Sequence, residues 1–220
     1  KGWVPEPGAE LQDGARYYFG EFGSARDADV LNETVVPQLV EAGMPPVAIP
    51  RAEAADAAGV ARSPAFQLWL LDLLAFTAGL GVQDQAAPES QFSLKRQVTR
   101  RLRKWHGRIL ADGKHFVELE DEAKHELRKL AKRLRYGLTL TQSLYAGHNL
   151  KAYKKSLSAL QDVLGEINDL VVARERYAEL AHAEPHAWFA VGWTTARLSN
   201  LYDDAQASIG RLADTRPFWR

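Results

Sequence analysis

Apolar residues recur at intervals of three and four along almost the whole chain, which is the spacing of one face of an α-helix. No segment shows the sustained alternation of apolar and polar residues that a half-buried β-strand requires. Glycines and capping signals such as Ser63-Pro64 punctuate the pattern. It therefore predicts an all-α protein with helices over residues 9–22, 25–41, 64–78, 91–111, 121–146, 149–164, 167–182 and 186–213.

An internal repeat divides the chain. The segment FGSARDADV at 22–30 matches LGEINDLVV at 164–172 with an offset of 142 residues. Each copy is typical of a helix end, a turn at Gly23 or Gly165, and the first turn of the next helix. A repeat of this kind predicts two helical bundles that face each other across a pseudo-two-fold axis.

The repeat also predicts how the chain is organised. Residues 1–80 would be the remainder of a first repeat and residues 90–220 the second. The segment from Pro45 to Ala61, rich in Ala and Pro, is the expected long connection. The first copy of the helix 121–146 would fall before residue 1, so we expect the chain to be truncated at its N-terminus.

The most informative helix is the one containing HELRKLAKRLRY, at 125–136. At about 100° per residue, four cationic or titratable side chains fall within a sector of roughly 80°. The leucines of the same segment fall on a separate stripe, and Glu126 is its only acid. This arrangement predicts one packing face and one row of cations, formed by His125, Arg128, Lys132 and Arg135.

A second basic helix precedes it. The segment LKRQVTRRLRKWHGRIL, which starts at Leu94, holds seven Lys or Arg residues and no acid. Three of these lie close to one another around the helix, opposite an apolar stripe. A solvated face paired with acids elsewhere is the ordinary alternative for a single basic helix. For two such helices we expect one shared surface, lined by Arg96, Arg100 and Arg103 together with the first row; Arg26, Lys129 and Arg133 are secondary candidates.

Charge distribution strengthens this expectation. The 220 residues contain 28 basic and 28 acidic side chains, which gives a formal net charge of zero. The segment from Leu94 to Tyr136, however, contains 14 basic and 6 acidic residues, and the rest of the chain contains 14 basic and 22 acidic residues. Half of the cations thus occupy about a fifth of the chain, a distribution that favours a polyanionic partner.

Several other function classes receive little support. The chain has no cysteine, which excludes disulfides and thiolate chemistry. No apolar run approaches the roughly 20 residues of a membrane span, so we expect no membrane association of that kind. The GxxxxGK[ST] phosphate loop is absent, and the histidines lack paired ligand spacing. We therefore expect no cofactor, no metal site and no catalytic residues.

Four motifs in the same order resemble those of the CHAD family, the histidine-containing α-helical domains. They are FGSARDADVL, HELRKLAKRLRY, LSALQDVLGEINDL and the closing RPFWR. The resemblance covers almost the whole chain and implies a CHAD fold, with two antiparallel bundles of four-helix type, related by a pseudo-two-fold axis, that enclose a basic channel for inorganic polyphosphate. It carries the family's HxxRxxxKxxR row onto His125, Arg128, Lys132 and Arg135, and the ARD motif onto residues 25–27. The family's first-repeat row is missing here.

The leading hypothesis is thus a non-catalytic, cytoplasmic module that binds polyphosphate and associates with polyphosphate granules. A nucleic-acid-binding helical protein that uses the same cations is the alternative. A third possibility is an accessory domain of a triphosphatase, because CHAD domains often follow a CYTH domain; any CYTH domain would lie in a longer parent chain.

Overall fold

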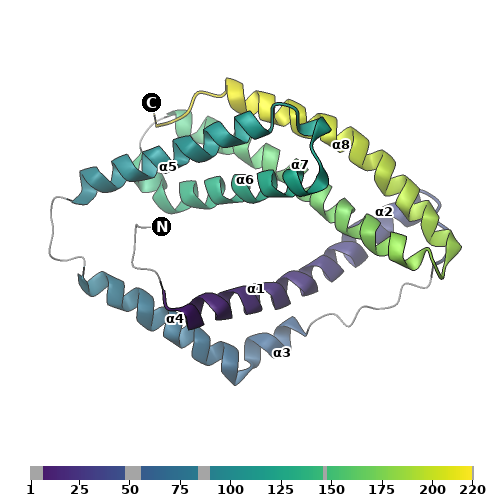
Figure 1. Cartoon of the computed structure of the whole chain (residues 1–220), viewed down its shortest axis with the longest axis horizontal. Helices are drawn as coiled ribbons and strands as arrows, with labels where there is room; N and C mark the ends of the chain where they lie inside the picture. Colours follow the sequence, from purple (N-terminus) through teal and green to yellow (C-terminus); the bar gives the residue numbers. More distant parts are fainter. Residues whose placement is uncertain (1–6, 48–55, 84–89, 146–147, 220) are drawn as a thin grey trace. The chain divides into compact units, whose positions relative to one another are not determined.

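The computed structural model describes residues 7–47, 56–83, 90–145 and 148–219, and these parts are helical and contain no β-strand. They form two compact units, one made of residues 1–43 and 47–91 and the other of 44–46 and 92–220 (Figure 1). The expectation of an all-α fold is therefore confirmed. That the two units are related by a pseudo-two-fold repeat stays a prediction.

Unit 1 consists of α1 (Ala9–Val30), a π-helical turn (Leu31–Val35), α2 (Val36–Glu41), α3 (Ala57–Arg62) and α4 (Pro64–Gln83). Aromatic side chains join α1 to α4, because the ring of Tyr18 lies 4.9 Å from that of Phe66 and 5.2 Å from that of Trp69. The Ser63 hydroxyl accepts a hydrogen bond from the Phe66 amide at 3.2 Å, as its position before the helix predicts.

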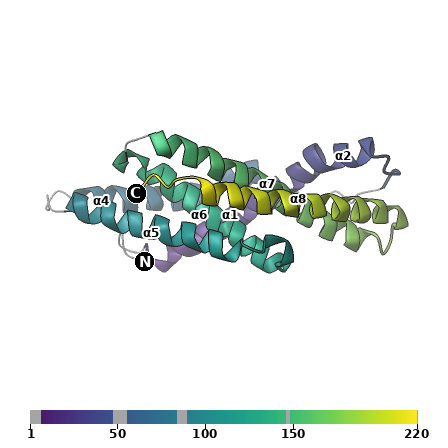
Figure 2. The ribbon, with the colours of Figure 1, turned by 90° about the horizontal axis from the view of Figure 1, so that it is seen from above.

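Unit 2 contains four long helices: α5 (Ser90–Asp112), α6 (Asp121–Thr141), α7 (His148–Leu180) and α8 (Trp188–Asp214). Short 3₁₀ turns over Phe116–Glu118, Gln142–Leu144 and Pro185–Ala187 connect them. The helices α7 and α8 pack along each other, and α6 packs on α7 (Figure 2). The core between them is formed by buried side chains that include Val98, Leu102, Ile109, Leu127, Leu134, Leu138, Leu160, Leu164, Ile209 and Leu212.

The predicted glycine turns are wrong. Gly23 lies inside α1 and Gly165 inside α7, so two pairs of expected helices are merged. A glycine within a helix costs only about 0.5–1 kcal/mol relative to alanine, and a continuous apolar face outweighs that cost. In α7, for example, Leu164 and Ile167 on either side of the glycine are 2% and 4% exposed. The matching segments are therefore stretches of helix and not helix ends.

Other boundaries also differ from expectation. The expected long connection at 45–61 includes α3, which begins at Ala57, while 48–55 lie outside the described residues. The helix α4 continues five residues beyond the predicted end at 78. The helix α6 stops at Thr141 and continues as a 3₁₀ turn, short of the predicted 146.

Candidate functional site

The helix α6 separates packing from charge as its sequence predicts. Leu127, Leu134 and Leu138 are at most 2% exposed, so they anchor one face in the core of unit 2. On the other side of the helix, His125 and Arg135 are exposed and Arg128 and Lys132 are half-buried. Burial of the leucine stripe therefore fixes the direction in which the four-residue row points.

A small pocket open to solvent lies between α6 and α7 at one end of this row. His125 and Arg128 line it from α6, and Asn168 lines it from α7. The remaining lining residues are Asp121, Lys124, Leu164, Ile167 and Val171. The structure thus brings two of the predicted site residues into one concave surface, which combines an apolar floor with hydrogen-bond donors.

The other end of the row also lies against α7. The Arg135 Nη1 donates to Oε1 of Gln161 at 3.0 Å, and Nε2 of Gln161 donates to the Ala131 carbonyl at 2.8 Å. One amide side chain therefore holds the guanidinium in place and ties it to the α6 backbone. The row runs along the seam between α6 and α7.

Two further cations near the pocket were missed by the sequence analysis. The Arg174 Nη2 donates to Oδ2 of Asp121 at 2.8 Å. Lys124 is 7% exposed, with its Nζ 3.9 Å from Oδ1 of Asp121 and 4.3 Å from the ring centre of Tyr202. Burial, reinforced by Asp121, raises the pKa of the Tyr202 hydroxyl. Asp121 is the first residue of α6 and pairs with these cations. Arg174 lies far away in sequence, so no local pattern could have signalled this contact.

The secondary candidates on α6 lie on the flank that faces α5. Lys129 forms an ion pair with Glu126, and its hydrogen bond to this carboxylate lowers the pKa of Glu126. Arg133 and Glu126 line a surface depression together with Arg108 and Asp112 of α5. Arg108 itself donates to Asp112 at 3.1 Å. On this flank, acidic side chains neutralise cations, so Lys129 and Arg108 have less charge to offer a ligand.

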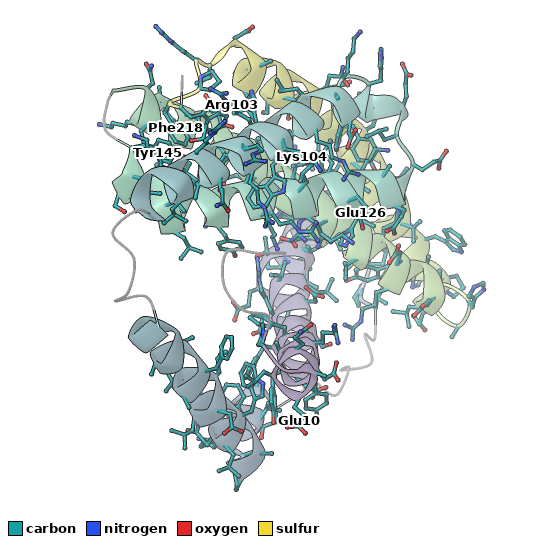
Figure 3. All side chains as sticks on the ribbon, turned by 60° about the vertical axis from the view of Figure 1, so that its left-hand side comes forward. Glu10, Arg103, Lys104, Glu126, Tyr145 and Phe218 are labelled. Atoms are coloured by element: carbon teal, nitrogen blue, oxygen red, sulfur yellow. The ribbon has the colours of Figure 1, made fainter. Side chains whose placement is uncertain are left out.

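The predicted row on α5 has a different environment. The described contacts direct Arg103 toward the C-terminal segment, where its Nη2 donates to the Trp219 carbonyl at 3.3 Å. Figure 3 shows Arg103 beside Phe218 and Tyr145, whose rings lie 4.8 Å apart. The face that α5 turns toward α6 instead carries Trp105, whose ring lies against Gly137.

Arg96 and Arg100 are exposed on α5. That the α5 row and the α6 row line a single surface stays a prediction. Arg26 is exposed on α1 in unit 1, and its participation in the site also stays a prediction.

Two general features of the described residues complete the picture. No three His, Asp or Glu side chains in these parts of the chain gather closely enough to hold a metal ion. None of the helices within the described ranges combines the length and the apolar character needed to cross a bilayer.

Comparison with known proteins identifies the fold. The family model of the CHAD domain matches residues 1–178. The crystal structure of the CHAD domain from the plant Ricinus communis is similar, with a TM-score of 0.76 and 28% sequence identity, and the match covers 97% of this chain and 74% of that chain. No curated protein matches the chain. The helical architecture, the motifs and the family match together show that the chain belongs to the CHAD domain family.

Proposed function

We propose that the chain binds inorganic polyphosphate through the α6 row, without catalysing a reaction. The observation that carries this proposal is the placement of His125 and Arg128 in one solvent-open pocket, with Lys132 and Arg135 following along the same helix. From His125 to Arg135 the row spans about 15 Å at 1.5 Å per residue. That length suits a chain of several phosphates better than a single small anion.

Multivalent electrostatics explains how such a row works. Arginine and lysine donate charge-assisted hydrogen bonds to phosphate oxygens. These contacts do not require the ligand to carry a nucleobase. Each contact displaces counterions from the polyanion, so affinity falls steeply as salt rises. Protonation of His125 would add a further donor at the pocket end of the row.

Single-stranded RNA is the main competing ligand, and one observation favours it. Tyr136 on α6 is 59% exposed, next to Arg135, so its ring could stack on a base. Trp105, the aromatic residue of the other basic helix, is half-buried against Gly137 and less available for stacking.

The test compares long-chain polyphosphate with single-stranded RNA of matched charge, across a salt series. Polyphosphate should bind more tightly at every salt concentration. Tyr136→Leu should weaken RNA binding and leave polyphosphate binding unchanged. If RNA bound as tightly as polyphosphate or more tightly, and Tyr136→Leu lost RNA affinity, the nucleic-acid alternative would replace the proposal.

The wider setting is part of the same proposal. Polyphosphate binding would place the protein in the cytoplasm at polyphosphate granules. It would also suit an accessory role beside a CYTH triphosphatase domain, by holding the polymer near the active site. Co-localisation of the tagged protein with stained granules tests the first of these settings.

A further inference from the structure

The seam between α6 and α7 has a consistent antiparallel register. Lys154 donates to Gln142 at 3.0 Å, Gln161 contacts Arg135, and Arg174 contacts Asp121. As the α7 residue number rises, the number of its partner in α6, or in the 3₁₀ turn that follows α6, falls by a similar amount. Asn168 follows the same register, because it lines the pocket with His125 and Arg128.

Three polar residues of α7 lie at heptad spacing along this seam: Lys154, Gln161 and Asn168. Residues seven apart lie on one face of a helix, with a drift of only about 20°. The α6 row is thus accompanied along α7 by a lysine and two amides. The acid Glu166 pairs with Arg197 of α8 at 2.9 Å, and the acid Asp169 accepts a hydrogen bond from Nδ2 of Asn168 at 3.5 Å.

The difference between an amide and a carboxylate matters here. An amide accepts a hydrogen bond from a guanidinium and orients it but leaves its charge in place. The opposite flank of α6 shows the other arrangement, because Glu126 pairs with Lys129 there. A polyanion gains less from a cation whose charge is already neutralised.

Resting on the function proposed above, we propose that Gln161 and Asn168 form the neutral second wall of the anion site. Gln161 is a positioning residue, which holds the Arg135 guanidinium without cancelling its charge. Asn168 contributes its amide to the pocket and contacts the ligand beside His125 and Arg128.

The test replaces each amide by the acid of the same shape in the complete chain. Gln161→Glu and Asn168→Asp should each weaken the binding of long-chain polyphosphate by about tenfold at low salt, the loss expected for one charge-assisted contact. Each should also lower the salt slope, by roughly 0.9 or less. The melting temperature without ligand should change little for Gln161→Glu, because the new carboxylate pairs with Arg135 while the hydrogen bond to the Ala131 carbonyl is lost. A merely structural role would predict the opposite pattern, with lower stability and unchanged affinity.

A matched control and a gain-of-charge variant complete the design. Asn149→Asp makes the same chemical change at an exposed position of α7, about 28 Å from Asn168 along the helix axis. It should alter affinity by less than about twofold. Asn168→Arg adds a cation to the pocket and should tighten binding, and it decides the question if the acid variants fail to fold.

The outcomes separate the two proposals. If the wild-type protein binds polyphosphate and the acid variants bind it with an affinity within twofold of wild type, the role of the amides is overturned and the proposed function stands. Weaker or unchanged binding by Asn168→Arg would overturn the role of Asn168 in the same way. Wild-type protein that fails to bind polyphosphate even at low salt would overturn the proposed function itself.

Discussion

Reversal of two charges in the middle of the α6 row is the most direct test of the site. In Arg128→Glu with Lys132→Glu, two half-buried cations become carboxylates beside the pocket and the seam. Their Cα atoms stand about 6 Å apart along the helix axis, at 1.5 Å per residue. That separation is shorter than the Debye length of about 10 Å at 0.1 M salt. Both residues therefore act on the same stretch of a bound polyanion.

The expected loss is large. A hydrogen bond to a charged group contributes about 1.5–3 kcal/mol, so two lost contacts weaken binding by roughly 3–6 kcal/mol. This corresponds to about 10²–10⁴-fold in the dissociation constant. The slope of log affinity against log salt should fall in magnitude by about 1.8 or less. Both side chains are half-buried and take part in interactions of the folded protein, so the stability of the variant without ligand is measured beside its affinity.

Isothermal titration with long-chain polyphosphate at several salt concentrations measures both quantities, and thermal melting without ligand monitors the fold. Lys151→Glu with Lys155→Glu is the matched control. It changes the net charge equally, at the same four-residue spacing, on the exposed side of α7. If the control lost as much affinity as the test variant, net charge and not the α6 row would govern binding. Wild-type affinity in the folded test variant would refute the assignment of the row.

Three further predictions follow from the helices themselves. Gly23→Ala and Gly165→Ala should each raise the free energy of unfolding, measured in urea, by about 0.5–1 kcal/mol. Both glycines lie inside helices, and a Cβ added at either position would meet no atom within 4 Å. A loss of stability would instead support the glycine turns that the sequence predicted. Leu134→Ala removes a side chain with 0% exposure and should cost about 2–5 kcal/mol in the same assay; a cost below about 1 kcal/mol would show that this face of α6 is not packed. The pKa of Glu126 lies below its ordinary value of 4.5, because Lys129 stabilises the carboxylate. The ion pair therefore contributes stability above the unfolded-state pKa of Glu126, and this contribution is lost as pH falls through the folded-state pKa. Lys129→Met should therefore move the NMR titration midpoint of Glu126 upward toward 4.5, and an unchanged midpoint would exclude the ion pair in solution.

Local periodicity was enough to establish the helices and the character of each face. The leucine stripe and the cation row of α6 are consequences of the 3.6-residue period, because side chains three, four and seven apart share a face whatever surrounds the helix. The positions of His125, Arg128, Lys132 and Arg135 away from the core could therefore be derived from the sequence. The same holds for the all-α class and for the Ser63 cap.

Tertiary packing decided what the sequence could not. Whether Gly165 ends a helix depends on apolar contacts on both sides of it, which outweigh its weak local preference. The environments of Arg103 and Arg174 depend on Trp219 and on Asp121, which lie far from them in the sequence. Helical periodicity gives the direction of a side chain around its own axis, but not which neighbouring helix lies there. Neutralisation of a charge is a short-range effect. The Glu126–Lys129 pair lies within one turn of α6 and follows from helical spacing, whereas only the packed structure brings Asp121 of α6 beside Arg174 of α7 and forms the pocket there.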